Sequence, residues 1–106
     1  IVTEKATEAA GHAIQRAMTV RAALKPLADQ VIRSASSVPA NLSEGHGRIG
    51  RDRLHFWRIS YGSAKEVDVH LRLLVTAGAI EVTRAERVLQ SFDEIRAMTW
   101  RLLHPK

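Results

Sequence analysis

The stretch SSVPANLSEGHGR, residues 36–48, places a proline, an asparagine and a glycine-rich end inside a chain that otherwise shows plain helical periodicity. It continues an apolar stripe whose members are three or four residues apart, which predicts one core-facing helix. The stripe consists of Leu27, Val31, Ala35, Val38 and Leu42. Pro39 removes a backbone hydrogen bond, so we expect this second helix to be kinked near Pro39 and to end at Gly45.

Three further segments have helical periodicity. Residues 4–24 are rich in alanine, the best helix former, and Lys25-Pro26 should end that helix. Residues 51–77 predict a third helix, whose apolar arc is wider than the ~100° of an ordinary surface helix. Thr83 and Glu86 predict a capping box at the start of a fourth helix. The connections are short, which favours antiparallel neighbours.

The predicted fold is therefore all-α: an up-and-down antiparallel four-helix bundle that forms a single domain over residues 1–106. Two faces exceed what one small bundle can cover, namely the alanine face of residues 4–24 and the apolar arc of residues 51–77. We therefore expect the chain to assemble as a homo-oligomer.

The charge balance favours contact with polyanions. The 106 residues include 16 Lys and Arg against 11 Asp and Glu, a net charge of +5, and the pI is near 10.4. The absence of cysteine excludes disulfides and thiolate chemistry. No apolar run approaches the roughly 18–20 residues of a membrane span, and the first residues lack a signal-peptide core. We expect a cytoplasmic protein with no membrane contact.

The sequence favours neither catalysis nor metal binding. A di-iron site in a bundle needs repeated Glu-x-x-His pairs, whereas Glu66 and His70 are four residues apart, as are Glu8 and His12. No serine lies in a G-x-S-x-G elbow, and residues 45–48 lack the Lys-Ser/Thr ending of a phosphate-binding loop. We predict a non-enzyme without metal or cofactor; the alternative is an enzyme or ligand carrier that uses the bundle interior or the lumen of a ring-shaped oligomer.

Two polar constellations lie on the second and third predicted helices. The first comprises Ser34, Ser37, Asn41, Glu44 and Arg48, and the second Ser60, Gly62, Ser63 and Glu66. Small residues allow close helix approach, and an unpaired buried carboxylate is costly. We therefore expect the constellations to meet, with Glu66 partly buried and paired. The alternative is a solvated face on which Glu44 and Arg48 form an ordinary i,i+4 pair.

Positive charge gathers after the second helix. Residues 48–78 hold six basic and three acidic side chains, a net charge of +3, whereas residues 25–47 have no net charge. Arg48, Arg51 and Arg53 occupy a glycine-rich turn, and Arg58 follows on the third helix. Guanidinium groups bind phosphate bidentately, so these four arginines are the candidate nucleic-acid contacts. Arg51 and Arg53 are preferred, because Glu44 can hold Arg48.

Two motifs carry a family resemblance. SVPANLSEG, residues 37–45, resembles the S-[IV]-P-x-N-[IL]-[AS]-E-G signature of the four-helix bundle proteins encoded in intervening sequences of bacterial 23S ribosomal RNA genes. FWRISYGSAKE, residues 56–66, is similar to that family's F-x-x-I-[AS]-x-G-S-x-x-E. The chain resembles more weakly the accessory variability determinant proteins of diversity-generating retroelements, which share the fold.

The resemblance implies a small basic protein that assembles as a ring, typically a pentamer. The retroelement relatives bind nucleic acid and a reverse transcriptase, so the implied partners are further copies of the chain, RNA or DNA, and a reverse transcriptase or another protein. It also assigns Asn41, Glu44, Ser63 and Glu66 to polar pairing rather than to chemistry. We predict a non-enzymatic, ring-forming protein that associates with nucleic acid; the alternative is an assembly scaffold with no direct nucleic-acid contact.

Overall fold

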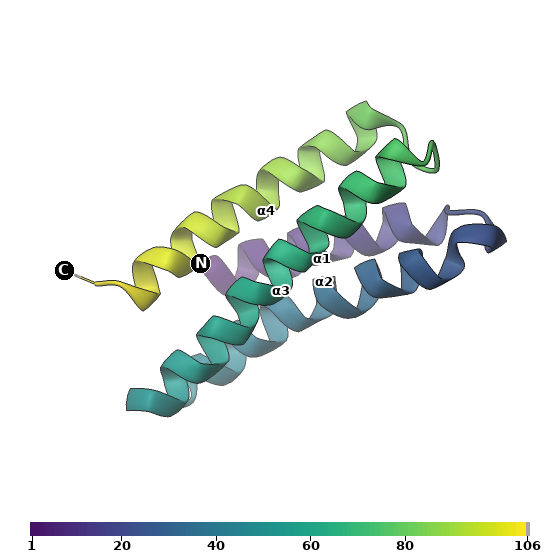
Figure 1. Ribbon diagram of the computed structural model, residues 1–106. Helices are drawn as coiled ribbons and strands as arrows, with labels where there is room; N and C mark the ends of the chain where they lie inside the picture. The colour runs from purple at the N-terminus through teal and green to yellow at the C-terminus, as the bar shows by residue number, and fades with distance from the viewer. Residues whose placement is uncertain (106) are drawn as a thin grey trace.

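Four α-helices run up and down in succession in the computed structural model, which describes residues 1–105. They are α1 (Val2–Met18), α2 (Lys25–His46), α3 (Gly50–Thr76) and α4 (Val82–Leu103), with a short 3-10 helix, η1 (Ala22–Leu24), before α2. Helices α1 and α3 each pack against both α2 and α4 (Figure 1). The predicted all-α four-helix architecture is confirmed for the described residues; Lys106, the last residue of the predicted domain, lies outside them.

The first helix is shorter than predicted, because α1 ends at Met18 and not near residue 24. The hydroxyl of Thr19 donates to the carbonyl oxygen of Arg16 at 2.8 Å, and such local bonds compete with helix continuation. After this interruption the chain forms η1 and then α2, with Pro26 in the first turn of α2. That position suits proline, whose missing N–H has no partner there in any case.

The backbone conformation of Gly78 ends α3. This glycine has a φ of 78°, which side chains other than glycine rarely adopt. Its N–H donates to Val75 O, and the N–H of Ala79 donates to Leu74 O, both at 2.9 Å. These two bonds form a Schellman motif, which satisfies carbonyls that the end of the helix would otherwise leave unpaired.

The start of α4 differs from the prediction. Glu81 is the N-cap, with extended backbone, and Val82 is already helical. Thr83 therefore lies inside the first turn, where its hydroxyl donates to Glu81 Oε1 at 2.6 Å. The predicted capping box between Thr83 and Glu86 is wrong, because the extended backbone before Val82 starts the helix two residues earlier.

The second helix is unbroken through Pro39. It continues to His46, one residue beyond the predicted end, and Gly47 is its C-cap. The apolar stripe keeps its phase across the proline: Val31, Val38 and Leu42 are all fully buried. The kink near Pro39 stays a prediction.

The core joins all four helices, and its largest fully buried side chains are Phe92, Leu42, Leu71, Leu74 and Ile95. The alanine face of α1 also belongs to it: Ala6, Ala9, Ala10, Ala13 and Ala17 are buried. Because α1 packs against both α2 and α4, these alanines are covered within one chain. The alanine face therefore gives no reason to expect an oligomer, contrary to the prediction. Within residues 1–105, no helix has both the length and the apolarity needed to cross a membrane.

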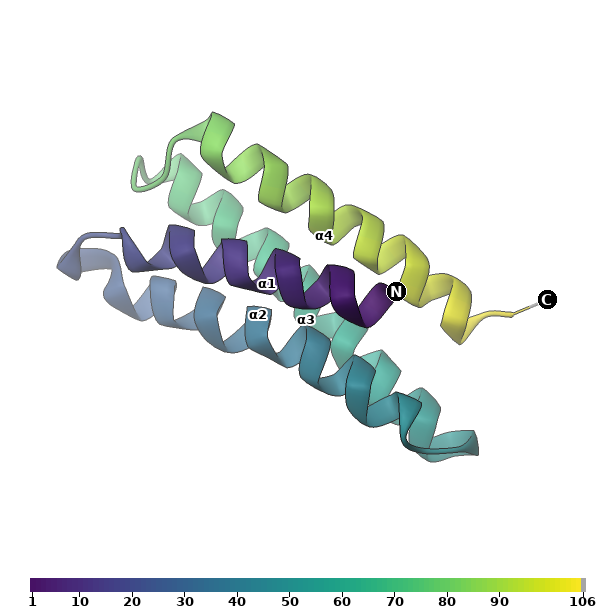
Figure 2. The same ribbon diagram turned by 180° about the vertical axis from the view of Figure 1, so that it is seen from behind.

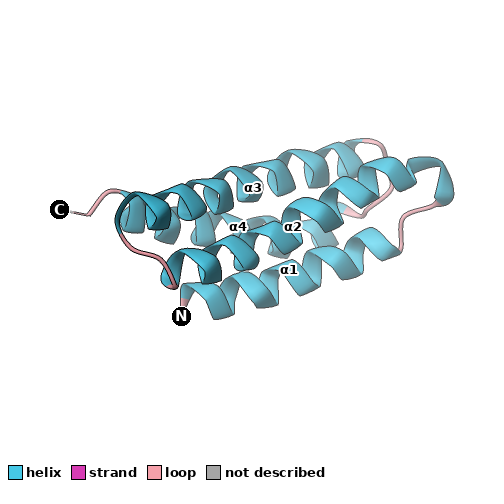
Figure 3. Ribbon diagram, turned by 90° about the horizontal axis from the view of Figure 1, so that it is seen from below, coloured by secondary structure: helices cyan, strands magenta, loops and turns pink. Residues whose placement is uncertain are grey.

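The α2–α3 hairpin projects from one end of the bundle. Its turn lies at the same end as both chain termini (Figure 3). There the beginning of α3 and the end of α4 diverge, as two opposite views show (Figures 1 and 2). The turn between α2 and α3 is consequently held away from α1 and α4. Beside it, the outer sides of α3 and α4 are accessible to solvent.

Candidate nucleic-acid interface

The projecting hairpin brings the candidate arginines together. Residues 47–49 connect α2 to α3, and Arg51, Arg53 and Arg58 follow on the first three turns of α3. Residues 45–58 include four arginines and one acidic residue, Asp52, which gives this segment a net charge of +3. The four arginines differ, however, in what their side chains contact.

Arg48 is held on the hairpin, as predicted. Its Nε donates to Glu44 Oε2 at 3.0 Å, an i,i+4 pair in which both side chains are about half exposed. Its guanidinium carbon also lies 5.1 Å from the centroid of the Phe56 ring, within the range of a cation–π contact. Glu44 was predicted to face the polar block around Ser63; it contacts Arg48 instead.

Arg53 closes the end of α2. Its Nε donates to Gly45 O at 3.1 Å and its Nη2 to His46 O at 3.3 Å. These carbonyls belong to the last turn of α2, where intrahelical donors are missing. The guanidinium also lies 5.4 Å from the centroid of the Trp57 ring. Arg53 was a preferred phosphate contact, but its side chain has a structural role in this hairpin.

Arg51 and Arg58 are the cations that the hairpin leaves exposed. Both side chains are on the surface of α3. Among the described residues, neither forms a salt bridge with an acidic side chain within 4.0 Å. The two arginines are seven residues apart, which is about two helical turns, so they point to the same side of α3.

Trp57 fixes the distance between α2 and α3 near the turn. It is 7% exposed, and its Nε1 lies 3.4 Å from Leu42 O, to which it donates. The indole lies directly against Gly45, where an added Cβ would approach Cδ1 and Nε1 closer than 3.0 Å. The glycine of the SEG sequence is therefore required by the tryptophan that packs on it. His46 contacts the same ring edge-on, with 5.4 Å between ring centroids.

The two polar constellations meet across the α2–α3 interface. The hydroxyls of Ser37 and Ser63 are 2.8 Å apart, and Asn41 Nδ2 donates to Ser37 O at 2.8 Å and to Ser37 Oγ at 2.9 Å. One turn away, the buried hydroxyl of Ser60 donates to Val38 O at 2.8 Å. Short hydroxyl side chains thus let the two helices approach closely while their polar atoms stay paired.

Glu66 is paired and about half covered. Its Oε2 accepts a bond from Arg33 Nη2 at 2.9 Å, so its partner comes from α2, as expected. Its side chain is 46% exposed, so the expected partial burial extends to about half of the side chain in the single chain. The apolar residues beside it in the sequence point to other sides of α3, which explains why they did not cover the carboxylate.

An ion network joins α3 to α4. Asp68, which is 9% exposed, accepts a bond from Arg72 Nε at 2.7 Å and lies 3.7 Å from Arg96 Nη2. The hydrogen bond and charge of Asp68, with a smaller contribution from Asp93, raise the pKa of Arg72 above its ordinary value. Arg96 also pairs with Asp93. The Asp68–Arg72 and Asp93–Arg96 pairs are local to α3 and α4, whereas the contact between Asp68 and Arg96 joins the two helices and was not indicated by any sequence motif.

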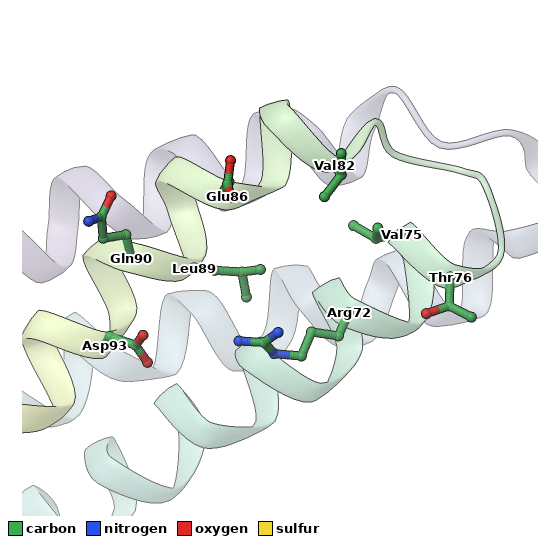
Figure 4. A pocket seen from close by; sticks show the side chains of 8 residues that line it. All are labelled: Arg72, Val75, Thr76, Val82, Glu86, Leu89, Gln90 and Asp93. Atoms are coloured by element: carbon green, nitrogen blue, oxygen red, sulfur yellow. The ribbon is translucent and has the colours of Figure 1, made fainter.

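Two hollows lie along the α3–α4 groove. The larger has a volume of about 570 Å³. Figure 4 shows Leu89 and Val82 of α4 and Val75 of α3 pointing into it, and Arg72 extending along it toward Asp93. The second, of about 530 Å³, is lined by Tyr61, Asp93, Arg96, Ala97, Trp100 and Arg101. Sequence reasoning missed both hollows, since each is formed by the packing of α3 against α4 and not by a motif on one helix. Within residues 1–105, no group of three His, Asp or Glu side chains is arranged to hold a metal ion.

The family model of the 23S rRNA-intervening sequence proteins matches residues 1–101. The chain belongs to this family. The match covers both motifs, the hairpin between them and nearly all of α4. The family resemblance drawn from residues 37–45 and 56–66 is therefore confirmed.

A solved structure supports the fold. It is the crystal structure of a protein of unknown function from the S23 ribosomal protein family of Bacteroides thetaiotaomicron. It is 22% identical to this chain and superposes with a TM-score of 0.88, covering 98% of this chain and 99% of the other. At this identity the likeness concerns the fold alone. No curated protein matches the chain.

Proposed function

We propose that this protein is a non-enzymatic, ring-forming oligomer that associates with RNA or DNA through the α2–α3 hairpin. The observation that carries this proposal is the pair of exposed arginines, Arg51 and Arg58, which form no salt bridge among the described residues. The net charge of +5 supports it, because a basic protein attracts polyanions over its whole surface. Charge, exposure and self-association are sufficient for this role, which uses no catalytic group and no cofactor.

Self-association is supported by the outer side of α3. Ile59, Val69 and Leu73 are 38%, 55% and 49% exposed, although α3 packs against both α2 and α4. Positions 59, 66, 69 and 73 share the side of α3 that faces away from the core. Covering these apolar side chains with another copy would remove them from water. The family resemblance favours a ring of five.

A ring would multiply the charge of the hairpin. Each of five copies would present Arg51 and Arg58, so ten guanidinium groups would lie at the same height on one rim. A single pair of exposed cations binds phosphate weakly, whereas a closed array neutralises several phosphates at once. Oligomerisation and nucleic-acid binding are therefore coupled in this proposal.

Binding is tested by fluorescence anisotropy with labelled RNA and DNA over a salt series. The double variant Arg51→Ala/Arg58→Ala should weaken binding to unrelated sequences by similar factors. It should also flatten the plot of log affinity against log salt by roughly 0.7–0.9 for each phosphate that the variant no longer neutralises. Arg53 is left intact in this variant, because its removal would also release the carbonyls at the end of α2.

The matched control is Arg21→Ala/Arg84→Ala. It also removes two positive charges, but from exposed positions just before η1 and at the start of α4, at the far end of the bundle from the hairpin. Among the described residues, neither arginine forms a salt bridge. The control should retain the salt slope of the parent. Absence of binding by the parent at low salt contradicts the proposal, as does an equal loss of affinity in the two variants.

The oligomer is tested separately by native mass spectrometry and light scattering. The mass should be a multiple of 11.8 kDa, near five. Leu73→Asp places a charge on the exposed apolar side of α3 and should lower the oligomer mass, while helix content by circular dichroism stays the same. A monomeric parent at micromolar concentration removes the basis for the ring.

The second candidate is a protein-assembly scaffold with no direct nucleic-acid contact, and the same exposed residues, Ile59, Val69 and Leu73, favour it. In this case the positive charge serves solubility, and the surface of α3 binds a protein such as the reverse transcriptase of the retroelement relatives. An oligomer of the expected mass that binds no RNA or DNA at low salt selects this candidate.

A further inference from the structure

A half-exposed tryptophan lies at the open end of the α3–α4 groove. Trp100 of α4 is 51% exposed, which is unusual for the largest apolar side chain. One side of it stacks on His104, with 3.7 Å between ring centroids and 29° between ring planes. Tyr61 of α3 lies across the groove, 6.0 Å away and tilted by 47°. The hollow between them, lined also by Arg96 and Arg101, is the aromatic hollow.

A row of basic residues runs beside this hollow along α3. Arg51, Arg58, Lys65 and Arg72 recur every seven residues, and all four are exposed. Seven residues rise about 10 Å along a helix, so the basic row extends for roughly 30 Å. Each member of the row is offset from the previous one by about 20° around the helix axis. At the C-terminal end of the row, Arg72 lines the larger hollow of the α3–α4 groove and pairs with Asp68, so among the described residues the charges left unpaired in the row are those of Arg51, Arg58 and Lys65.

The basic row and the aromatic hollow adjoin one another. Lys65 Nζ lies 5.9 Å from the centroid of the Tyr61 ring, which places one member of the row at the edge of the hollow. Within the hollow, Arg96 is neutralised by Asp68 and Asp93. Among the described residues, Lys65 and Arg101 form no such salt bridge. Two cations that are unpaired within the described part of the chain, Lys65 and Arg101, therefore flank the exposed aromatic surface.

We infer that the aromatic hollow is a stacking subsite for an unpaired base of a single-stranded nucleic acid, whose phosphates follow the basic row; this rests on the proposed function. Trp100 and Tyr61 supply flat apolar surface, and cations spaced along α3 supply the charge that a polyanionic backbone requires. Aromatic side chains beside a basic track are the usual means of binding single strands without sequence preference. A base paired in a duplex has its faces covered by its neighbours, so a duplex should gain nothing from Trp100.

The ligand chemistry follows from charge complementarity. A second copy of this basic chain would bring further cations to a surface that already carries Arg51, Arg58, Lys65 and Arg101. The exposed apolar residues Val69 and Leu73 do not line the aromatic hollow, so binding of a base there leaves them available for self-association.

The test uses the full chain and four labelled probes: single-stranded 15-nucleotide oligothymidine and oligouridine, and DNA and RNA duplexes of the same length. The parent should bind single strands more tightly than duplexes at equal salt. Trp100→Ala should weaken single-strand binding by roughly 5- to 150-fold, with an unchanged salt slope because no charge is removed. Trp100→Phe, which retains an aromatic ring, should recover most of the affinity. Met18→Ala, at a residue that is 74% exposed at the end of α1, is the control and should bind like the parent.

A direct readout comes from tryptophan fluorescence. The chain has two tryptophans, and Trp57 is buried while Trp100 is half exposed. Unlabelled oligothymidine should quench the parent, whereas Trp100→Phe, which retains only Trp57, should show little change. This measurement applies even if Trp100→Ala fails to fold.

The outcomes separate the two proposals. A parent that binds no probe contradicts the proposed function and with it the stacking subsite. A parent that binds single strands and duplexes equally, with neither weaker binding in Trp100→Ala nor quenching, overturns the stacking subsite alone. Tryptophan quenching that depends on protein concentration and not on added oligonucleotide also overturns the stacking subsite. Such a result identifies a second copy of the chain as the group that covers Trp100.

Discussion

Replacing Gly45 by alanine should destabilise the protein, although glycine-to-alanine changes in helices usually stabilise. The added Cβ would lie closer than 3.0 Å to two atoms of the Trp57 ring and 3.2 Å from the backbone oxygen of Arg53. Unstrained carbon contacts are about 3.5–4.0 Å. The ring cannot move away easily, since it is 7% exposed and donates to Leu42 O.

The magnitude follows from two opposing effects. Overpacking of this kind costs about 1–3 kcal/mol. The gain from alanine in a helix interior is about 1 kcal/mol, and it is smaller here because Gly45 is in the last turn of α2. We expect a net loss of stability of about 1–2 kcal/mol. A loss of 1 kcal/mol lowers the Tm of a domain of this size by about 4–8 °C.

The assay is thermal and urea unfolding followed by circular dichroism, at one protein concentration. Gly11→Ala is the matched control, because no atom lies within 4 Å of an added Cβ in the middle of α1. It should raise stability by up to about 1 kcal/mol. If Gly45→Ala is as stable as Gly11→Ala, the tryptophan does not determine the glycine, and the close packing described for the hairpin is wrong.

Further expectations concern the outer surface and the helix contacts. Gly62→Ala, also without atoms near the added Cβ, should stabilise the single chain like Gly11→Ala; if the outer side of α3 is the oligomer contact, it should also lower the oligomer mass in native mass spectrometry. Ser60→Ala removes the buried hydrogen bond from the Ser60 hydroxyl to Val38 O and should cost about 1 kcal/mol in urea unfolding. Asp68→Asn breaks a largely buried ion network and should cost about 1–3 kcal/mol, whereas Asp29→Asn, in an exposed i,i+4 pair, should change stability by less than about 0.5 kcal/mol.

The helices, and the contact between α2 and α3, could be predicted from the sequence. The apolar stripe through Val38 predicted α2, and the short polar residues at positions 37 and 63 indicated that two helices approach closely there. Both are local signals: one is a repeat of three or four residues, and the other is a cluster of small side chains within one helix. Both can therefore be recognised without knowledge of the tertiary structure.

The contacts of individual side chains were harder to predict from the sequence. Arg53 was predicted to contact phosphate, but the carbonyls that it binds become available only when α2 ends beside the start of α3. Glu66 was expected to be at least partly buried because its sequence neighbours are apolar, but how much of a helical side chain is covered depends on its angular position on the helix. The pair Tyr61 and Trp100 joins residues 39 positions apart on two helices. Such pairs follow from how helices are packed and not from a motif on one of them.

Side-chain hydrogen bonds between helices are distributed unevenly in the bundle, and this distribution determines which helix opens first in the native state. Side-chain hydrogen bonds cross between α2 and α3 at several levels, from Arg33–Glu66 through Ser37–Ser63 and Ser60 to the turn. In contrast, α1 contributes mainly alanine methyl groups to the core, and its one side-chain bond to another helix among the described residues runs from Arg16 Nε to a carbonyl of α4. Regions with fewer buried contacts open at lower free energy. Amide protons of α1 should therefore exchange with solvent first, by detachment of that helix, while those of the α2–α3 hairpin remain protected until the whole chain unfolds.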